Sequence, residues 1–167
     1  MAWPYRPATA VSAPPPIDPA HARPPGVDDR VVKAVGQLTE ALEKIERARG
    51  RLYDFHQLVG AADCLLDHVV AGLRETGHHE LADHIEQELI GRNVLPGRWT
   101  FQIVEEFDEG YYAVFRAEEE RVRNALLAGH RHVWEAELKQ RRRTWGRPGH
   151  EARPEPEPSG DGARSRR

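Results

Sequence analysis

The sequence has little of several residue types, and each scarcity excludes a class of protein. A single cysteine, Cys64, among 167 residues excludes an internal disulfide and fits a reducing compartment. No stretch approaches the roughly 20 apolar residues that a membrane-spanning helix needs. The segment from Met1 to Ala20 carries prolines where a secretion signal has an apolar run. We therefore expect a soluble, cytoplasmic protein.

Motifs of catalysis are also missing. The sequence contains no Gly-rich dinucleotide loop, no Walker loop, no Gly-x-Ser-x-Gly and no paired-Cys motif. Cys64 has no positive neighbour at helical spacing, so we expect a buried, unreactive thiol. Enzymatic activity therefore has no specific indication in the sequence.

Lysine is scarce, with three residues against 21 arginines, and the charge is unevenly spread. Residues 1–27 carry a net charge of +1 and residues 141–167 a net +4, so residues 28–140 carry −8 of a total of −3. An acidic body does not favour binding to a phosphate backbone, which leaves the C-terminal tail as the basic element.

Proline marks both ends of the chain. Residues 1–27 contain eight prolines and predict a disordered, extended leader, and residues 146–167 predict a disordered tail rich in Arg, Pro and Glu. We expect a single all-α domain at 28–145, an elongated helical bundle. Its predicted elements are a long coiled-coil-like helix at 29–76, helices at 79–92 and 112–142, and a small aromatic-rich extended insert at 96–110.

The long helix is predicted from one heptad register. Alternating steps of four and three residues define what we call the inner seam: Val31, Val35, Leu38, Leu42, Ile45, Arg49, Leu52, His56, Val59, Asp63, Leu66, Val70 and Leu73. Ten of these thirteen residues are apolar, which is typical of helices packed lengthwise on one another. Asp28 or Asp29 is the expected N-cap, and Gly77 the expected C-terminal glycine. A hairpin bent at Gly50 is the alternative.

Three polar residues interrupt the inner seam at intervals of seven: Arg49, His56 and Asp63. Buried polar groups are costly unless they satisfy one another, so such a column can specify register or partner. In an antiparallel homodimer Arg49 would face the Asp63 of the other copy. The alternative is a seam that drifts by one residue, through Phe55, Ala62 and Val69.

The insert is aromatic and borders an acidic run. Trp99, Phe101 and Ile103 alternate with polar residues, which predicts an extended segment, and Tyr111 to Phe115 could return as a second strand or begin the last helix. Trp99, Phe101, Tyr111 and Tyr112 could form a recognition patch. They could equally be a plug that covers the open end of the bundle, which is the interpretation we favour.

Nine histidines raise the possibility of a metal site. A di-metal carboxylate bundle needs two Glu-x-x-His motifs, and Glu75 to His78 is the single match. His84 and Glu88, four residues apart, could also bind a metal from one helix face. We predict no cofactor, with Glu75, His78, His84 and Glu88 as the metal candidates.

The C-terminal basic segment contains Arg141, Arg142, Arg143 and Arg147. Its Gly146-Arg147-Pro148 resembles the core of an AT-hook, a resemblance that implies insertion of an arginine into the minor groove of DNA. The family has arginine where this chain has Trp145. Nucleic-acid binding is therefore an alternative function and not our main prediction.

We predict a non-catalytic assembly or adaptor protein that acts through helix–helix self-association, as a homodimer, and through its tails or aromatic insert toward other proteins. A metal-binding bundle, possibly enzymatic, and a nucleic-acid-associated protein are the alternatives.

Overall fold

The computed structural model describes residues 16–153, and these residues form helices and no β-strand. The all-α prediction is confirmed. Within the described part of the chain the order of elements is a 3₁₀-helix, η1 (Pro19–His21), then α1 (Asp29–Glu75), α2 (His79–Glu88), α3 (Thr100–Phe107), a π-helix η2 (Asp108–Tyr112), α4 (Ala113–Leu127) and α5 (Val133–Arg142). None of these helices is both long and apolar enough to cross a bilayer.

The long helix α1 is a single, uninterrupted element of 47 residues, about 70 Å at 1.5 Å per residue. It passes straight through Gly50, so the alternative of a hairpin bent there is wrong. Asp28 is the N-cap, because its carboxylate accepts the backbone N–H of Arg30 at 2.7 Å. At the other end Gly77, with φ of +84°, closes a Schellman motif in which the N–H of His78 donates to Leu73 O at 2.8 Å.

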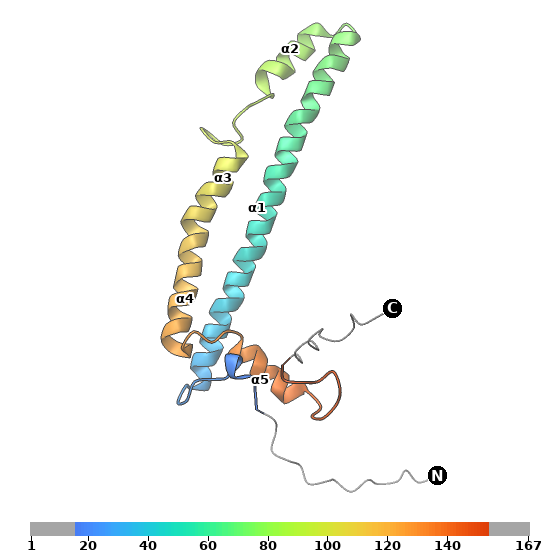
Figure 1. Cartoon of the computed structure of the whole chain (residues 1–167). Helices are drawn as coiled ribbons and strands as arrows, with labels where there is room; N and C mark the ends of the chain where they lie inside the picture. The colour runs from blue at the N-terminus through green and yellow to red at the C-terminus, as the bar shows by residue number, and fades with distance from the viewer. Residues whose placement is uncertain (1–15, 154–167) are drawn as a thin grey trace, which may run out of the picture. The chain divides into compact units, whose positions relative to one another are not determined.

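The described chain divides into two compact units, and one of them consists of residues 37–121. In this hairpin unit α2, α3, η2 and the start of α4 return alongside α1 (Figure 1). The side of α1 that faces this return arm is the predicted inner seam, because the unit's seam residues from Leu38 to Leu73 are buried or half-buried. Phe55, Ala62 and Val69 are exposed. A seam that drifts onto these three residues is therefore wrong.

Residues 100–112 are helical, which corrects the predicted extended insert at 96–110 and the hairpin with Tyr111 to Phe115. α3 begins at Thr100, and the side chain of Gln102 caps its start by accepting the N–H of Trp99 at 2.8 Å. The alternation at 99–103 is misleading because Ile103 and Val104 together face inward, as on a helix. Extended character is confined to the turn before α3, where Leu95 and Arg98 form an isolated bridge.

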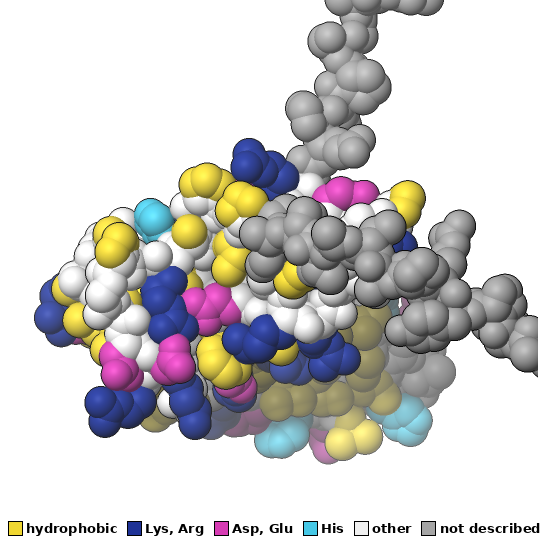
Figure 2. All heavy atoms as spheres, turned by 90° about the horizontal axis from the view of Figure 1, so that it is seen from below, with side chains coloured by type: hydrophobic (Ala, Val, Ile, Leu, Met, Phe, Trp, Pro, Cys, Tyr) yellow, Lys and Arg dark blue, Asp and Glu magenta, His cyan; other side chains and the backbone are white. Residues whose placement is uncertain are grey.

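The second unit joins residues 16–36 with residues 122–153. Its core consists of four aliphatic side chains, Val32, Val35, Leu127 and Val133, all at most 3% exposed. Gly36 allows a close approach here, since a Cβ at this position would lie 3.4 Å from the Cβ of Trp134. On the face seen in Figure 2, hydrophobic side chains are interspersed with Lys, Arg, Asp and Glu.

The segment before α1 makes hydrogen bonds and an ion pair with α5 and with the turn that precedes α5. Arg23 forms a two-point ion pair with Glu137 of α5, at 2.7 and 2.8 Å, and the pair raises the pKa of Arg23. The ring N–H of His21 donates to Arg131 O at 2.8 Å, and that of His130 donates to Ala22 O at 2.6 Å. The prediction of disorder is therefore wrong for residues 16–27; the rest of the predicted leader, 1–15, lies outside the described residues.

The predicted last helix, 112–142, is two helices. α4 ends at Leu127, and residues 128–132 form a break in which Ala128, Gly129 and His132 all have positive φ. The N–H of Gly129 reaches back to Arg123 O at 3.3 Å, while the Arg123 side chain donates to Gly129 O at 2.9 Å. Helices commonly end at a glycine with positive φ, so Gly129 is the residue in the sequence that indicates this helix end. In the same way α2 ends at Glu88, four residues before the predicted 92.

Two faces of the long helix as candidate interaction surfaces

Arg49 is the centre of a polar cluster between α1 and the return arm. Its guanidinium forms a two-point ion pair with Asp108, the first residue of the π-helix, with both N–O distances 2.7 Å. The same group lies 4.8 Å from the ring centre of Tyr53 and 5.0 Å from that of Tyr112. A planar guanidinium is suited to this combination of paired oxygens and aromatic faces.

The cluster has clear electrostatic consequences. Hydrogen bonding by Arg49 lowers the pKa of the Asp108 carboxyl, and the hydroxyl of Tyr53 adds a further hydrogen bond of 3.1 Å to it. The Tyr112 hydroxyl donates to Glu46 at 2.6 Å, which raises the pKa of Tyr112. Each charge in the cluster therefore meets an opposite charge or a hydrogen-bond partner from its own chain.

His56 and Asp63 continue the pattern along α1. The Nδ1 of His56 is hydrogen-bonded to the hydroxyl of Thr100, the first residue of α3, at 2.7 Å. The carboxylate of Asp63 accepts the backbone N–H of Gly91, after α2, at 2.9 Å. We call these three contacts the polar ladder: Arg49–Asp108, His56–Thr100 and Asp63–Gly91.

The polar ladder runs antiparallel. Its rungs step by seven residues along α1 and by eight and nine along the return arm. The predicted column is therefore occupied within one chain, and Arg49 does not need the Asp63 of a second copy. Its role in specifying register stays a prediction, now for the fold of the hairpin unit.

A second apolar face of α1 has no such cover. Phe55, Leu58, Leu65 and Val69 are exposed, from 39% for Phe55 to 70% for Leu58. They belong to a row with steps of three and four residues that we call the outer strip: Phe55, Leu58, Ala62, Leu65, Val69 and Gly72, all exposed. At 3.6 residues per turn this row lies about a quarter of a turn around α1 from the inner seam.

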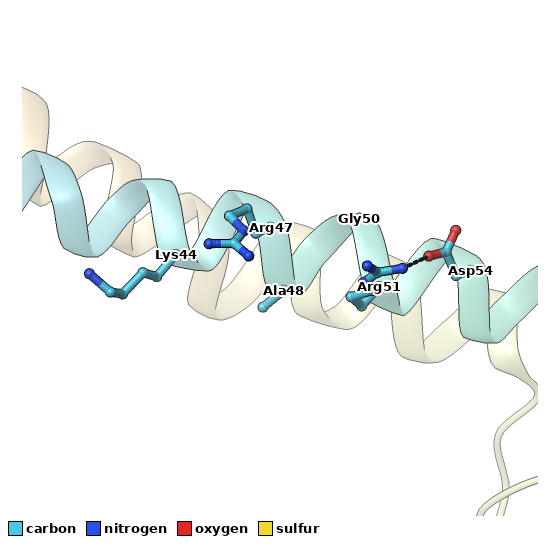
Figure 3. Close-up of a pocket in the computed structure, with 6 residues that line it drawn as sticks. All are labelled: Lys44, Arg47, Ala48, Gly50, Arg51 and Asp54. Atoms are coloured by element: carbon cyan, nitrogen blue, oxygen red, sulfur yellow. Dashed lines mark hydrogen bonds and ion pairs between the residues drawn. The ribbon is translucent and has the colours of Figure 1, made fainter.

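The same row continues toward the N-terminus with a different character. Lys44, Ala48 and Arg51 occupy the next positions, and they lie on one side of α1 around a shallow hollow (Figure 3). Arg51 is paired with Asp54 at 3.0 Å, and Lys44 with Glu40. The outer strip is therefore apolar over 55–72 and bordered by charge before it.

The four aromatic residues predicted as one patch or plug lie in different places. Trp99 lies over Gly91 and donates its ring N–H to Gly91 O at 3.2 Å, and Phe101 is exposed on α3. Tyr111 and Tyr112 instead gather with Phe107, whose ring is 6.1 and 6.3 Å from theirs. This second group lies against the middle of α1, through Tyr112 and Glu46, so the predicted plug at the open end of a bundle is wrong.

The candidate metal ligands are not brought together. Among residues 16–153, no group of three or more His, Cys, Asp and Glu side chains could hold an ion. His84 is exposed, and Glu88 is paired with Arg92 at 3.1 Å instead of with His84. Cys64 is exposed, which corrects the expected buried thiol. Within residues 16–153 the metal-binding alternative therefore has no assembled ligand group.

The nucleic-acid candidates lie at the end of α5 and beyond it. Arg141 lies 5.7 Å from the ring centre of Trp134, and Arg143 donates to His150 O at 3.3 Å. Gly146 has φ of +74° and belongs to a turn, and the AT-hook resemblance of the Gly-Arg-Pro segment stays a prediction. Arg142 and Arg147 are exposed. Residues 154–167 lie outside the described part of the chain.

No known protein family, curated protein or solved structure matches this chain.

Proposed function

We propose that the protein is a non-catalytic assembly module that associates with itself through the outer strip of α1. The observation that carries this proposal is the outer strip itself, an apolar row at heptad spacing with Leu58 70% and Leu65 62% exposed. Contiguous apolar surface of this kind marks interaction sites, and heptad spacing fits a partner that is also a helix.

The two faces of α1 differ in their contacts within the chain, and this difference supports the proposal. The inner seam is used within the chain, where the return arm covers it and the polar ladder satisfies its polar residues. The outer strip contributes no comparable contact to the fold of the hairpin unit. We therefore assign it a role outside the single chain, in a homodimer of hairpins built like a four-helix bundle.

The proposal is tested by the mass of the full chain in solution. We expect a dimer by native mass spectrometry and sedimentation, and a monomer of unchanged helicity for Leu65→Glu, because the charge would be buried in the interface. The matched control is Leu81→Glu on α2, equally apolar and 57% exposed but not on α1, which should leave the dimer intact. A wild-type monomer at tens of micromolar would contradict the proposal.

A further inference from the structure

We infer that a second copy of this chain lies antiparallel on the outer strip, with the two-fold axis between residues 63 and 64; this rests on the self-association proposed above. The inference names the occupant, its direction and its register. It follows from the sizes of the six strip residues, from one glycine that the fold of the single chain does not require, and from the charges at the two ends of the strip.

The six residues of the outer strip complement one another in size about this axis. Phe55 would face the partner's Gly72, Leu58 the partner's Val69, and Ala62 the partner's Leu65. Each of these three layers then combines a larger with a smaller side chain, which favours close packing. The two-fold repeats the three layers, so all six exposed positions of each copy are covered.

Gly72, like Gly50 and Gly60 of α1, has no contact in the single chain that requires glycine, and of these three it is the one on the outer strip. A Cβ at Gly72 would have nothing within 4 Å, and its φ is not in the left-handed region. Glycine inside a helix destabilises it by about 1 kcal/mol relative to alanine. A ring packed on the bare backbone of Gly72 gives this residue a purpose, and Phe55 of a second copy supplies the ring.

The flanks of the strip fit the same register. On one side, the half-buried inner-seam residues Leu52 and Val59 would approach the partner's Leu73 and Leu66, which widens the apolar contact. Beyond the end of the strip, Arg51 would lie beside the partner's Glu75. Arg51 already holds Asp54, so the cation would stand between two carboxylates.

A parallel copy in register lacks these matches. It would place Phe55 on Phe55 and Gly72 on Gly72, so that one layer is overfilled and another is empty. It would also bring Arg51 near Arg51 and Glu75 near Glu75. Charge and volume therefore favour the antiparallel direction together.

The size match is tested by a substitution and its rescue in the full chain. Gly72→Leu should raise the dimer Kd about ten-fold or more, because the new side chain overfills the layer of Phe55. The double variant Gly72→Leu/Phe55→Ala should recover most of that loss, since Ala now faces Leu. Gly60→Leu is the matched control: Gly60 is also inside α1 with open space around it, but it is not on the strip, so the Kd should not change.

The direction is tested by a distance. With Cys64 replaced by serine and a spin label on Glu75→Cys, the antiparallel register separates the two labels by about 35 Å along the helix, 23 rises of 1.5 Å. A parallel dimer would bring them within about 20 Å. A dimer with the short distance, or one unaffected by Gly72→Leu, overturns this inference and leaves self-association standing; a monomeric wild type overturns both.

Discussion

Residues 16–36 and 122–153 are held together chiefly by four aliphatic side chains, whereas the contacts that recur along α1 in the hairpin unit are polar. Val32, Val35, Leu127 and Val133 are almost completely buried. In the hairpin unit, by contrast, the seam residues are mostly half-buried and three of them are charged or imidazole groups. Apolar burial is non-directional, whereas a hydrogen bond requires one partner in one place. The core of residues 16–36 and 122–153 is thus apolar, whereas the hairpin unit adds directional hydrogen bonds to a seam of half-buried apolar residues.

The largest effect is expected at the four-residue apolar core. Leu127→Ala should lower the free energy of unfolding by about 2–5 kcal/mol, because it leaves a cavity among residues that are already few. The measurement is urea denaturation followed by circular dichroism. The neighbouring Leu126, 45% exposed, provides the control, and Leu126→Ala should cost far less. Equal losses for the two would mean that the core does not hold this unit.

A smaller effect is expected at the polar ladder, and it should depend on pH. Arg49 lowers the folded-state pKa of Asp108 below its ordinary value of 3.8, so the ion pair stabilises the fold above that value. The contribution is lost as the pH falls through the lowered folded-state pKa. Asp108→Asn should therefore lower the urea midpoint at about pH 7, and the difference from wild type should shrink toward zero in acid.

The control for the ladder is Glu118→Gln. Glu118 also has a lowered pKa, from its ion pair with Arg121, but both side chains are more than half exposed and lie three residues apart on one helix. Such pairs contribute little, so the urea midpoint should hardly move at any pH. A loss as large as that of Asp108→Asn would show that the ladder is not special.

The smallest effects are expected at two glycines of α1. Gly50 has open space around it, so Gly50→Ala should stabilise the protein by about 0.5–1 kcal/mol through helix propensity. Gly36 lies against Trp134, so the gain from Gly36→Ala should be smaller. Thermal unfolding of both variants measures the difference. A larger gain at Gly36 would contradict the tight contact with Trp134.

The inner seam could be predicted from the sequence because its evidence is local and repeated. The apolar period is sustained from Val31 to Leu73 and outweighs the helix-breaking tendency of Gly50, so α1 is one helix. The partners of Arg49, His56 and Asp63 could not be predicted in the same way. They come from residues 28 to 59 positions away in the chain, and no local pattern indicates that contact.

The insert and the outer strip differ from the predictions for different reasons. At 99–103 a short alternation resembled a strand, although Gln102 three residues after Trp99 was an available sign of a helix start. At Phe55, Ala62 and Val69 the apolar spacing indicates an alternative position for the inner seam, whereas these residues belong to a second row. Both rows exist on α1, and a helix with two apolar rows has room for two partners.

The π-helix at Asp108–Tyr112 also constrains the length of the chain. Its wider turn accommodates one more residue than an α-helix would, so that both Asp108 and Tyr112 reach α1. Deleting Gly110 would restore a regular α-helix, in which one residue fewer completes nearly the same rotation, so the helix beyond would keep its phase. The return arm should therefore tolerate the loss of one residue within the π-helix, whereas a deletion inside α3 or α4 would rotate everything beyond it by about 100°.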